Sequence, residues 1–321
     1  MPSTPKTIRF TVRAAATAAL TQAFANLSSG QSASFPQGAE TLLSTADYAW
    51  QTIFHHDALN GLIHLLGKPA NEPALWKHRY YTIATNTWTT VSLGMFNNDG
   101  HIYGNSALDT TTGDLYLTTQ DTLRKWTAAA GWTTPVADLH PSLNSHKNGV
   151  AFHPNLFGTG QRGLMIQAVN IVIYYNPVTN GVTYSSVPLS TGDNAGAGIY
   201  FAAVNKTITG YQNQSRVAPG PTLVQGPSTP IWTRGYSTTQ GAVFGALVQH
   251  PMNSAKMLLI ERNTDVSTAR RYWSSTDGDN WTLVGTHPFL TTSVFCSIVN
   301  NGIWTLSNTG TPYSFIWKPN L

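Results

Sequence analysis

Residues 272–283 are Tyr-Trp-Ser-Ser-Thr-Asp-Gly-Asp-Asn-Trp-Thr-Leu, and this stretch predicts a strand, a tight turn and a second strand. Tyr272 and Trp273 favour a strand, and Asp277-Gly278 supplies a turn that tolerates a positive φ. The aspartate can accept hydrogen bonds from nearby backbone groups, and Trp281 can pack back over the turn. We therefore predict that Asp277, Gly278 and Trp281 form a structural hairpin, of which weaker copies recur along most of the chain.

A strand of one type repeats from about residue 40 onward. Its copies begin at Gly61, Gly113, Gly163, Lys206, Lys256 and Gly302. Each of the first five copies is followed by a run that ends in an aromatic residue: Trp88, Trp132, Tyr184, Trp232 and Trp281. The period of about 48 residues has room for three or four short strands, which favours a β-propeller. A two-sheet sandwich would not by itself explain the near-constant period.

We expect an all-β chain with two parts. Residues 1–38 form an N-terminal arm and linker, and residues 39–321 form a single β-propeller, most simply with six blades. The sixth copy lacks its outermost strand because the sequence stops at Leu321. We expect the run Ala39–Thr45 to supply that strand and close the ring, which would remove two unpaired sheet edges. Seven blades are the alternative if the arm contributes more strands.

The repeat resembles those of the kelch and Asp-box groups of β-propellers. Ser275–Trp281 is similar to the Asp-box hairpin of sialidase-like propellers. Tyr174–Tyr184 and Tyr81–Trp88 resemble the kelch ending, which is a tyrosine, a turn and an aromatic residue. The resemblance covers the blade pattern over residues 40–321 and implies the fold, without a catalytic motif.

Composition excludes several classes of protein. Charged residues are 10% of the chain and aromatic residues 11%, which suits a sheet-rich protein and argues against disorder. The net charge of +4 is spread thinly, so we expect no nucleic-acid partner. The sequence has no run of about 18 apolar residues, so we expect no membrane span. The apolar stretch near the N-terminus is broken by polar residues, so we expect no export signal.

Histidines raise the hypothesis of a metal or lyase site: His55-His56-Asp57, His64, His153 and His250. His153 and His250 each precede a proline at the expected end of a blade's first strand, which favours a role in turns. A metal site built from His56, Asp57 and histidines of neighbouring blades is the alternative.

Hydrolase chemistry has weaker support. Glycosidases need two carboxyl groups at a controlled separation, and the sialidase-like resemblance would add an arginine cluster and a tyrosine–glutamate pair. Arg262, Arg270, Arg271 and Glu261 all fall in one blade. We therefore predict no catalytic residue, no metal ligand and no cofactor.

Two further features call for an interpretation. Gln212–Pro230 in the fourth blade is rich in proline and glycine, and it either binds a ligand or forms a passive rim loop.

Cys296 is the single cysteine, which excludes an internal disulfide. We expect its thiol to be buried in the first strand of the last blade.

The function favoured by the sequence is that of a non-enzymatic structural or binding propeller. We expect a virion component, tail- or capsid-associated as in a bacteriophage, that is assembled in the host cytoplasm. The arm would contact other protein subunits, and surface glycans are a further class of ligand. The alternative is a carbohydrate-active enzyme, a glycoside hydrolase or a polysaccharide lyase, that works in the propeller's axial pocket. A cytoplasmic or extracellular location is the corresponding alternative.

Overall fold

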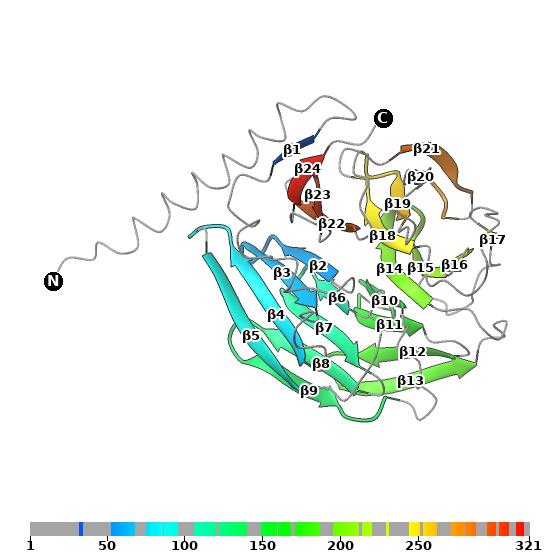
Figure 1. Ribbon diagram of the computed structural model, residues 1–321. Helices are drawn as coiled ribbons and strands as arrows, with labels where there is room; N and C mark the ends of the chain where they lie inside the picture. The colour runs from blue at the N-terminus through cyan, green and yellow to red at the C-terminus, as the bar shows by residue number, and fades with distance from the viewer. Residues whose placement is uncertain are drawn as a thin grey trace. The chain divides into compact units, whose positions relative to one another are not determined.

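Short β-strands joined by tight turns make up nearly all of the chain that the computed structural model describes (Figure 1). The described residues are 32–34, 53–67, 75–85, 87–95, 106–119, 122–139, 149–158, 160–167, 171–186, 195–211, 214–219, 229–230, 244–250, 253–261, 271–278, 280–286, 294–299, 302–307 and 313–317. Within them, the 3-10 turn Ala202–Val204 is the one helical element. The all-β prediction is confirmed for these residues.

The chain forms two units, of which unit 1 comprises Met1–Phe96 and Thr291–Leu321. Its described strands form two four-stranded antiparallel sheets. The first is a meander of β2 (Ile53–Asp57), β3 (Leu62–Gly67), β4 (Leu75–Thr82) and β5 (Thr87–Met95). The second has the order β1-β24-β23-β22, with β1 (Ser32–Ser34), β22 (Val294–Val299), β23 (Gly302–Ser307) and β24 (Tyr313–Trp317).

The strand β1 completes the C-terminal sheet of unit 1. It pairs antiparallel with β24, and Ser32 lies opposite Trp317 and Ser34 opposite Phe315. An N-terminal strand thus joins the last sheet, as expected, but the residues that we predicted were wrong. The strand lies within the segment that we interpreted as a linker, whereas Ala39–Thr45 lie outside the described residues.

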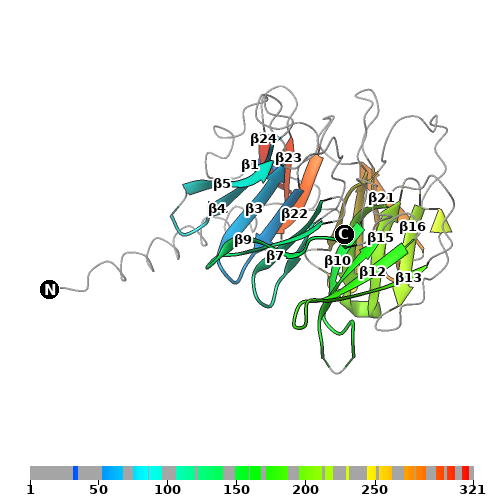
Figure 2. The same ribbon diagram turned by 90° about the horizontal axis from the view of Figure 1, so that it is seen from below.

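Unit 2 comprises Asn97–Leu290, and its described strands form four four-stranded antiparallel meanders. The strands are β6 (Ser106–Asp109), β7 (Asp114–Thr119), β8 (Thr122–Thr127), β9 (Gly131–Val136), β10 (Gly149–His153), β11 (Gly163–Gln167), β12 (Ile171–Asn176), β13 (Gly181–Ser186), β14 (Ala195–Phe201), β15 (Lys206–Tyr211), β16 (Gln214–Pro219), β17 (Thr229–Pro230), β18 (Phe244–Gln249), β19 (Met257–Glu261), β20 (Arg271–Ser275) and β21 (Thr282–Thr286). First strands pack in succession, β6 against β10, β10 against β14 and β14 against β18. Figure 2 shows strands of neighbouring sheets in this unit, such as β10 and β15, side by side.

The predicted repeat corresponds to these sheets. Every copy begins at or next to the first residue of the second strand of a sheet: β3, β7, β11, β15, β19 and β23. Gly61 and Gly113 open their copies because they sit in the preceding turn with φ of 66° and 75°. Each copy therefore accounts for one four-stranded sheet, and the closure of all sheets into a single ring stays a prediction.

The strand pair β16 and β17 corrects our interpretation of the fourth repeat. We interpreted Gln212–Pro230 as a loop that binds a ligand or lies passively at the rim, but Gln214–Pro219 forms the third strand of its sheet. Thr229–Pro230 forms the short fourth strand and pairs with Gln214 and Ser215. Proline is tolerated here because one occurs at the end of β16 and the other on the edge strand β17.

An apolar cluster joins the sheets β6–β9 and β10–β13 of unit 2. Tyr116 from β7 packs against Phe152 of β10 and Tyr175 of β12, with ring centroids 5.7 and 6.0 Å apart. Leu164 and Ile166 from β11 belong to the same cluster and are fully buried. Burial of each such aliphatic side chain contributes about 1.5–3 kcal/mol, so this cluster is a main source of cohesion between the two sheets.

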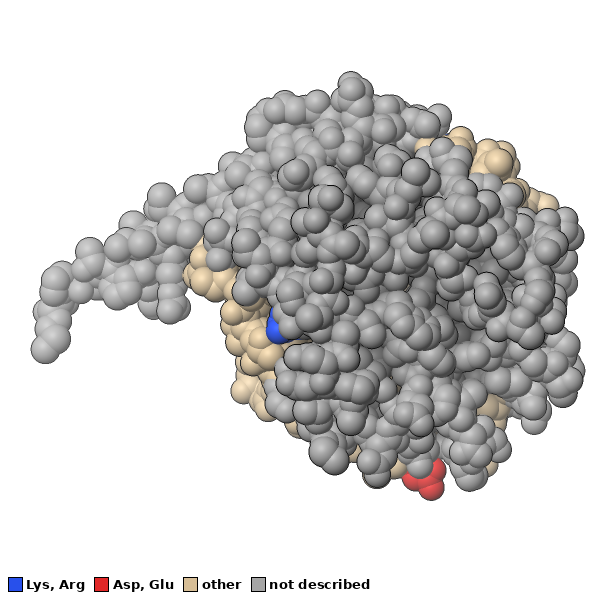
Figure 3. Space-filling model, in the orientation of Figure 1, with Lys and Arg blue, Asp and Glu red and all other residues tan. Residues whose placement is uncertain are grey.

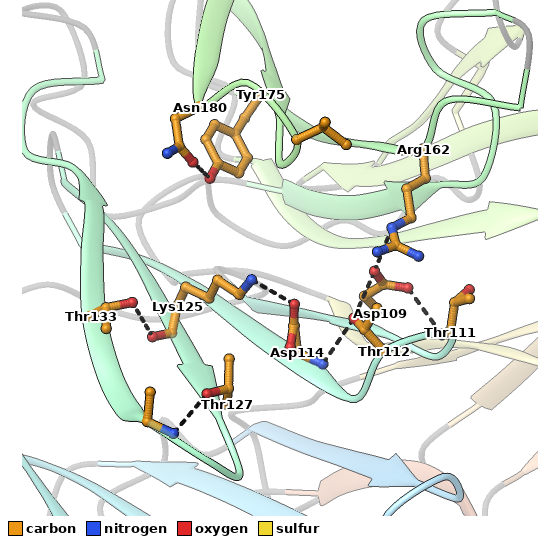
Figure 4. Close-up of polar contacts among 12 residues, drawn as sticks. Asp109, Thr111, Thr112, Asp114, Lys125, Thr127, Thr133, Arg162, Tyr175 and Asn180 are labelled. Carbon is orange, nitrogen blue, oxygen red and sulfur yellow. Dashed lines mark hydrogen bonds and ion pairs between the residues drawn. The ribbon is translucent and has the colours of Figure 1, made fainter.

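Charged side chains at the edge of this cluster form one ion pair between the two sheets and one within the sheet β6–β9 (Figure 4). Arg162, in the turn before β11, forms an ion pair of 2.9 Å with Asp109 at the end of β6. Lys125 of β8 forms one of 2.6 Å with Asp114 of β7, and its ammonium lies 5.7 Å from the centre of the Tyr116 ring. The first pair therefore ties the two sheets together, and the second holds a cation beside the buried ring of Tyr116.

Tyr116 provides a test of this packing. Its hydroxyl is buried and has no hydrogen-bond partner among the described residues, and burial raises the pKa of the phenol. Tyr116→Phe should leave the free energy of unfolding unchanged or raise it by about 1 kcal/mol, because an unsatisfied buried hydroxyl is removed. Tyr116→Ala should lower it by about 3–5 kcal/mol through the loss of packing. Urea unfolding at equilibrium measures both, and a large loss in Tyr116→Phe would mean that the hydroxyl is hydrogen-bonded.

Candidate functional site

Three histidines, an aspartate and a tyrosine share one face of the sheet β2–β5. His55 of β2 lies opposite His64 of β3, and Asp57 lies two residues after His55 on the same face. Tyr80 of β4 lies opposite His64, and His78 lies two residues before Tyr80. Asp57, His64 and His78 are each exposed by 1% or less. The sheet therefore gathers titratable side chains from three strands, and Asp57, His64 and His78 among them are closed to solvent.

Contacts among these side chains run in one series, from His78 to His64 and from His64 to Asp57. His64 Nδ1 lies 2.9 Å from His78 Nε2, and His64 Nε2 lies 3.7 Å from Asp57 Oδ2. Because a carboxylate faces Nε2 of His64, the proton of that neutral ring is best placed on Nε2. Its Nδ1 then accepts a hydrogen bond from the Nε2–H of His78. Asp57 also accepts hydrogen bonds from the backbone N–H of Asn60 at 3.0 Å and from its side-chain amide at 2.7 Å.

Electrostatics keep the two histidines neutral and the aspartate ionised at pH 7. Burial lowers the pKa of His64, and Asp57 only partly opposes this effect. Burial also lowers the pKa of His78, and His64 and His55 lower it further. For Asp57, burial alone would raise the pKa, but the contacts with His64 and Asn60 together lower it.

The chemistry that Asp57, His64 and His78 could perform is limited because a substrate has no access to these buried side chains. An aspartate that orients a histidine resembles a general-base arrangement, but such a base must reach its substrate. Both His64 and His78 are 0% exposed. Among the described residues, no group of three or more His, Cys, Asp or Glu side chains could hold a metal ion. His56 and Asp57 are neighbours in β2 and point to opposite faces, so they do not form the core of a metal site.

Sequence reasoning singled out His55, His56, Asp57 and His64 but missed His78 and Tyr80. The signal is a His-x-Asp pair in one strand, a histidine in the next, and a His-x-Tyr pair in the third. It becomes visible only when the register of the three strands is known, because that register decides which side chains share a face.

The two histidines that precede prolines lie in turns, where we expected them. His153 ends β10, and its Nδ1 accepts a hydrogen bond of 3.0 Å from the backbone N–H of Asn155. Its ring packs against Tyr200 with centroids 4.5 Å apart. His250 follows β18, and its backbone N–H donates a hydrogen bond of 3.0 Å to the carbonyl of Lys256. Both residues thus close the first hairpin of a sheet.

Aspartates take the same position in two other sheets. Asp57 ends β2, and Asp109 ends β6. Asp109 accepts hydrogen bonds from the backbone N–H of Thr111 at 3.0 Å and from the hydroxyl of Thr112 at 2.9 Å. A buried polar residue at the end of the first strand is therefore a repeated structural device.

The Asp277-Gly278 turn has the hydrogen bonds of a well-fixed hairpin between β20 and β21. Asp277 accepts bonds of 2.7 Å from both the backbone N–H and the side-chain amide of Asn280. Ser275 Oγ accepts a bond of 2.8 Å from the N–H of Gly278, whose φ is 80°. The indole N–H of Trp281 donates to the carbonyl of Gly278 at 3.1 Å, and its ring is half-buried. These bonds fix the turn locally, and the structural role of Asp277, Gly278 and Trp281 stays a prediction.

The repeat aromatics lie on outer strands. Trp88 in β5 is half-buried and packs on Tyr81 with ring centroids 5.4 Å apart. Trp132 in β9 lies opposite Trp126 of β8. Tyr184 in β13 is 62% exposed. Trp232 lies outside the residues that the structure describes.

The remaining residues that we singled out are placed only in part. Glu261 is the last residue of β19, and Arg271 is the first residue of β20. Arg262 and Arg270 lie outside the described residues, as do the side chains of Glu261 and Arg271. Cys296 lies in β22, the first strand of the C-terminal sheet in chain order, while the surroundings of its thiol are not among the described features.

Charged residues make up 10% of the whole chain. Figure 3 shows a basic spot and an acidic spot among the described residues of the face in view. In the same part of the chain, no helix is long and apolar enough to cross a membrane.

Comparison with solved structures defines the fold. This chain is similar to a chain of the mitotic checkpoint complex, at 10% identity over 92% of this chain and 93% of that one, with a TM-score of 0.54. It is similar to virginiamycin B lyase from Staphylococcus aureus, at 9% identity, 89% and 99% coverage and a TM-score of 0.55. A third match is the Neurospora crassa Pan2 WD40 domain, at 8% identity, 92% and 96% coverage and a TM-score of 0.50.

These likenesses show an all-β propeller, because WD40 repeats are blades of that fold. At identities of 8–10% they show the fold alone. The sequence matches no family model and no curated protein. The kelch and Asp-box resemblance therefore has no support from the comparisons.

The hairpin gives a test of its structural role. Asp277→Ala removes two short hydrogen bonds and should lower the free energy of unfolding by about 1–2 kcal/mol. Trp281→Ala should lower it by about 1–3 kcal/mol, because its half-buried ring and its bond to Gly278 are lost. Thermal unfolding measures both, with Thr282→Ala at an exposed neighbouring position as the control. An unchanged melting temperature for Trp281→Ala would place this residue on a binding surface instead.

Proposed function

We propose that this chain is a non-enzymatic binding propeller whose sheets form one six-bladed ring, built from residues 39–321 and closed by the strand β1 at Ser32–Ser34. The proposal rests on one observation: the side chains that could react are buried or hydrogen-bonded in structural roles. Asp57, His64 and His78 are sealed within a sheet, and Asp109 and His153 hold turns. Little catalytic chemistry is left to these side chains once they are bound in this way.

The outer strands support contacts with other molecules. Described exposed residues on them are mostly threonines, joined by one glycine, one tyrosine and one leucine: Thr87, Thr89, Thr90, Thr133, Thr134, Gly181, Thr183, Tyr184, Thr282 and Leu283. Uncharged hydroxyl and aromatic groups suit protein or glycan surfaces, because they make hydrogen bonds and stacking contacts at low desolvation cost. Solved structures with this fold include a chain of an assembled complex as well as a lyase.

The narrower role that we propose is that of an assembly or adhesion component of a virion, tail- or capsid-associated. Residues 1–38 would then attach the propeller to neighbouring protein subunits. Support comes from the low charge, the single cysteine and the polar but uncharged composition, which suit a protein assembled in one compartment and used in another. The geometry of the Ser275–Trp281 hairpin supports an Asp-box type of blade within this proposal.

A matched pair of truncations tests the attachment role. Removal of residues 1–31 retains β1 and should leave a propeller of unchanged thermal stability that no longer enters particles. Removal of residues 1–38 also deletes β1 and should lower the melting temperature, because β24 loses its edge partner. Quantification of the chain in purified particles is the readout. If the shorter truncation enters particles as well as the intact chain, the attachment role is wrong.

A turnover assay tests the binding class itself. The intact chain should cleave no member of a panel of neutral and uronic-acid polysaccharides, while glycan-array binding remains allowed. Turnover that disappears in His153→Gln or His64→Gln, with the fold retained, would establish the carbohydrate-active enzyme instead.

A further inference from the structure

We propose that the Asp57–His64–His78 cluster makes the sheet β2–β5 acid-sensitive, so that it is closed at neutral pH and opens in mildly acidic solution. This inference concerns a property of the fold and holds whether or not the chain is a virion component.

The geometry limits how many protons the cluster can hold. The 2.9 Å contact between His64 Nδ1 and His78 Nε2 needs one nitrogen to donate and the other to accept. When both rings are protonated, all four of their nitrogens carry hydrogens. The two N–H groups then point at each other at a distance that allows no favourable contact. Because these rings connect β3 to β4, and Asp57 connects them to β2, their separation loosens three strands together.

The groups that face the pair come from all the strands of this sheet. Asp57 and His55 face it from β2, and Tyr80 faces it from β4. The β5 residues opposite His78 and Tyr80 are Val91 and Thr89, which do not titrate. Among these described neighbours, Asp57 is the one anion and favours protonation of His64. Burial, and then the charge of His64, lower the pKa of His55 to about 3, so His55 is neutral at pH 5 and above.

The direction of the effect follows from proton binding. Burial lowers the pKa of both His64 and His78 below the value of 6.5 that an exposed histidine has. Below that pH the open sheet binds more protons than the closed one, so stability is complete above about pH 7 and falls as the pH decreases. For each histidine that stays neutral in the closed sheet, the opening equilibrium should rise about 30-fold between pH 7.5 and pH 5.

Hydrogen exchange of the intact chain at pH 7.5 and pH 5, corrected for intrinsic exchange rates, tests this inference. Backbone amides of 53–67 and 75–85 should lose at least about 30-fold in protection at pH 5. The sheet β6–β9 has no histidine in its strands and is the internal control. Its amides should change much less.

Variants show whether the Asp57–His64–His78 cluster, and not another effect of acid, causes the loss of amide protection. His64→Gln combined with His78→Gln keeps amide donors and acceptors but removes both titrating groups, and it should abolish most of the pH dependence in β2–β4. His56→Gln is the matched control on the opposite face of β2 and should behave like the unaltered chain. Equal loss of protection in β2–β4 and β6–β9, or the same pH dependence in the double variant, would overturn the inference.

A measurement on the unaltered chain covers the case in which the double variant does not fold. Imidazole signals of the buried pair in NMR spectra should titrate well below pH 6.5 and together with the loss of amide protection. Ordinary titration of all histidine signals near pH 6.5, with protection retained, would contradict the proposal.

Discussion

Three of the described sheets depend on the hydrogen bonds of a buried polar residue at the end of their first strand. Asp57, Asp109 and His153 each occupy this position, and each side chain accepts the N–H of a residue two or three positions further along. The bond satisfies a backbone donor that the tight turn would otherwise leave unpaired. It also fixes where the second strand begins, and the register of the sheet follows from that point.

Register in turn determines what each sheet buries. In the sheet β2–β5, a fixed register brings His64 and His78 together on one face, while Leu65 and Tyr81 share the other. In the sheet β10–β13, it directs Val150, Leu164 and Ile166 toward the cluster shared with the sheet β6–β9. A slip by one residue would exchange the two faces, so the turn residues act on packing far beyond their own hairpins.

The repeat and the fold class could be predicted because they depend on local signals. Gly61 and Gly113 mark turns through their positive φ, and Asp277-Gly278 marks a hairpin through its side-chain hydrogen bonds. The closing strand could not be located in this way, because Ser32–Ser34 has neither apolar alternation nor strand-forming residues. Its place in the sheet comes from backbone pairing with β24, which a sequence pattern does not record.

The candidate site was predictable only in part for a similar reason. Asp57 and His64 stand out as a histidine-rich stretch, whereas His78 lies fourteen residues after His64 in a strand that looks ordinary. Only strand pairing makes them neighbours. The role of these residues could not be predicted either, because burial decides whether an aspartate–histidine pair reacts with a substrate or holds a sheet together.

A crystal structure of the chain at neutral pH is the most direct test. We expect four-stranded sheets around one axis, an N-terminal strand at Ser32–Ser34 on the last sheet, and direct contact between the imidazoles of His64 and His78. Density for a metal ion between those rings, or two stacked sheets without a rotational axis, would contradict this expectation.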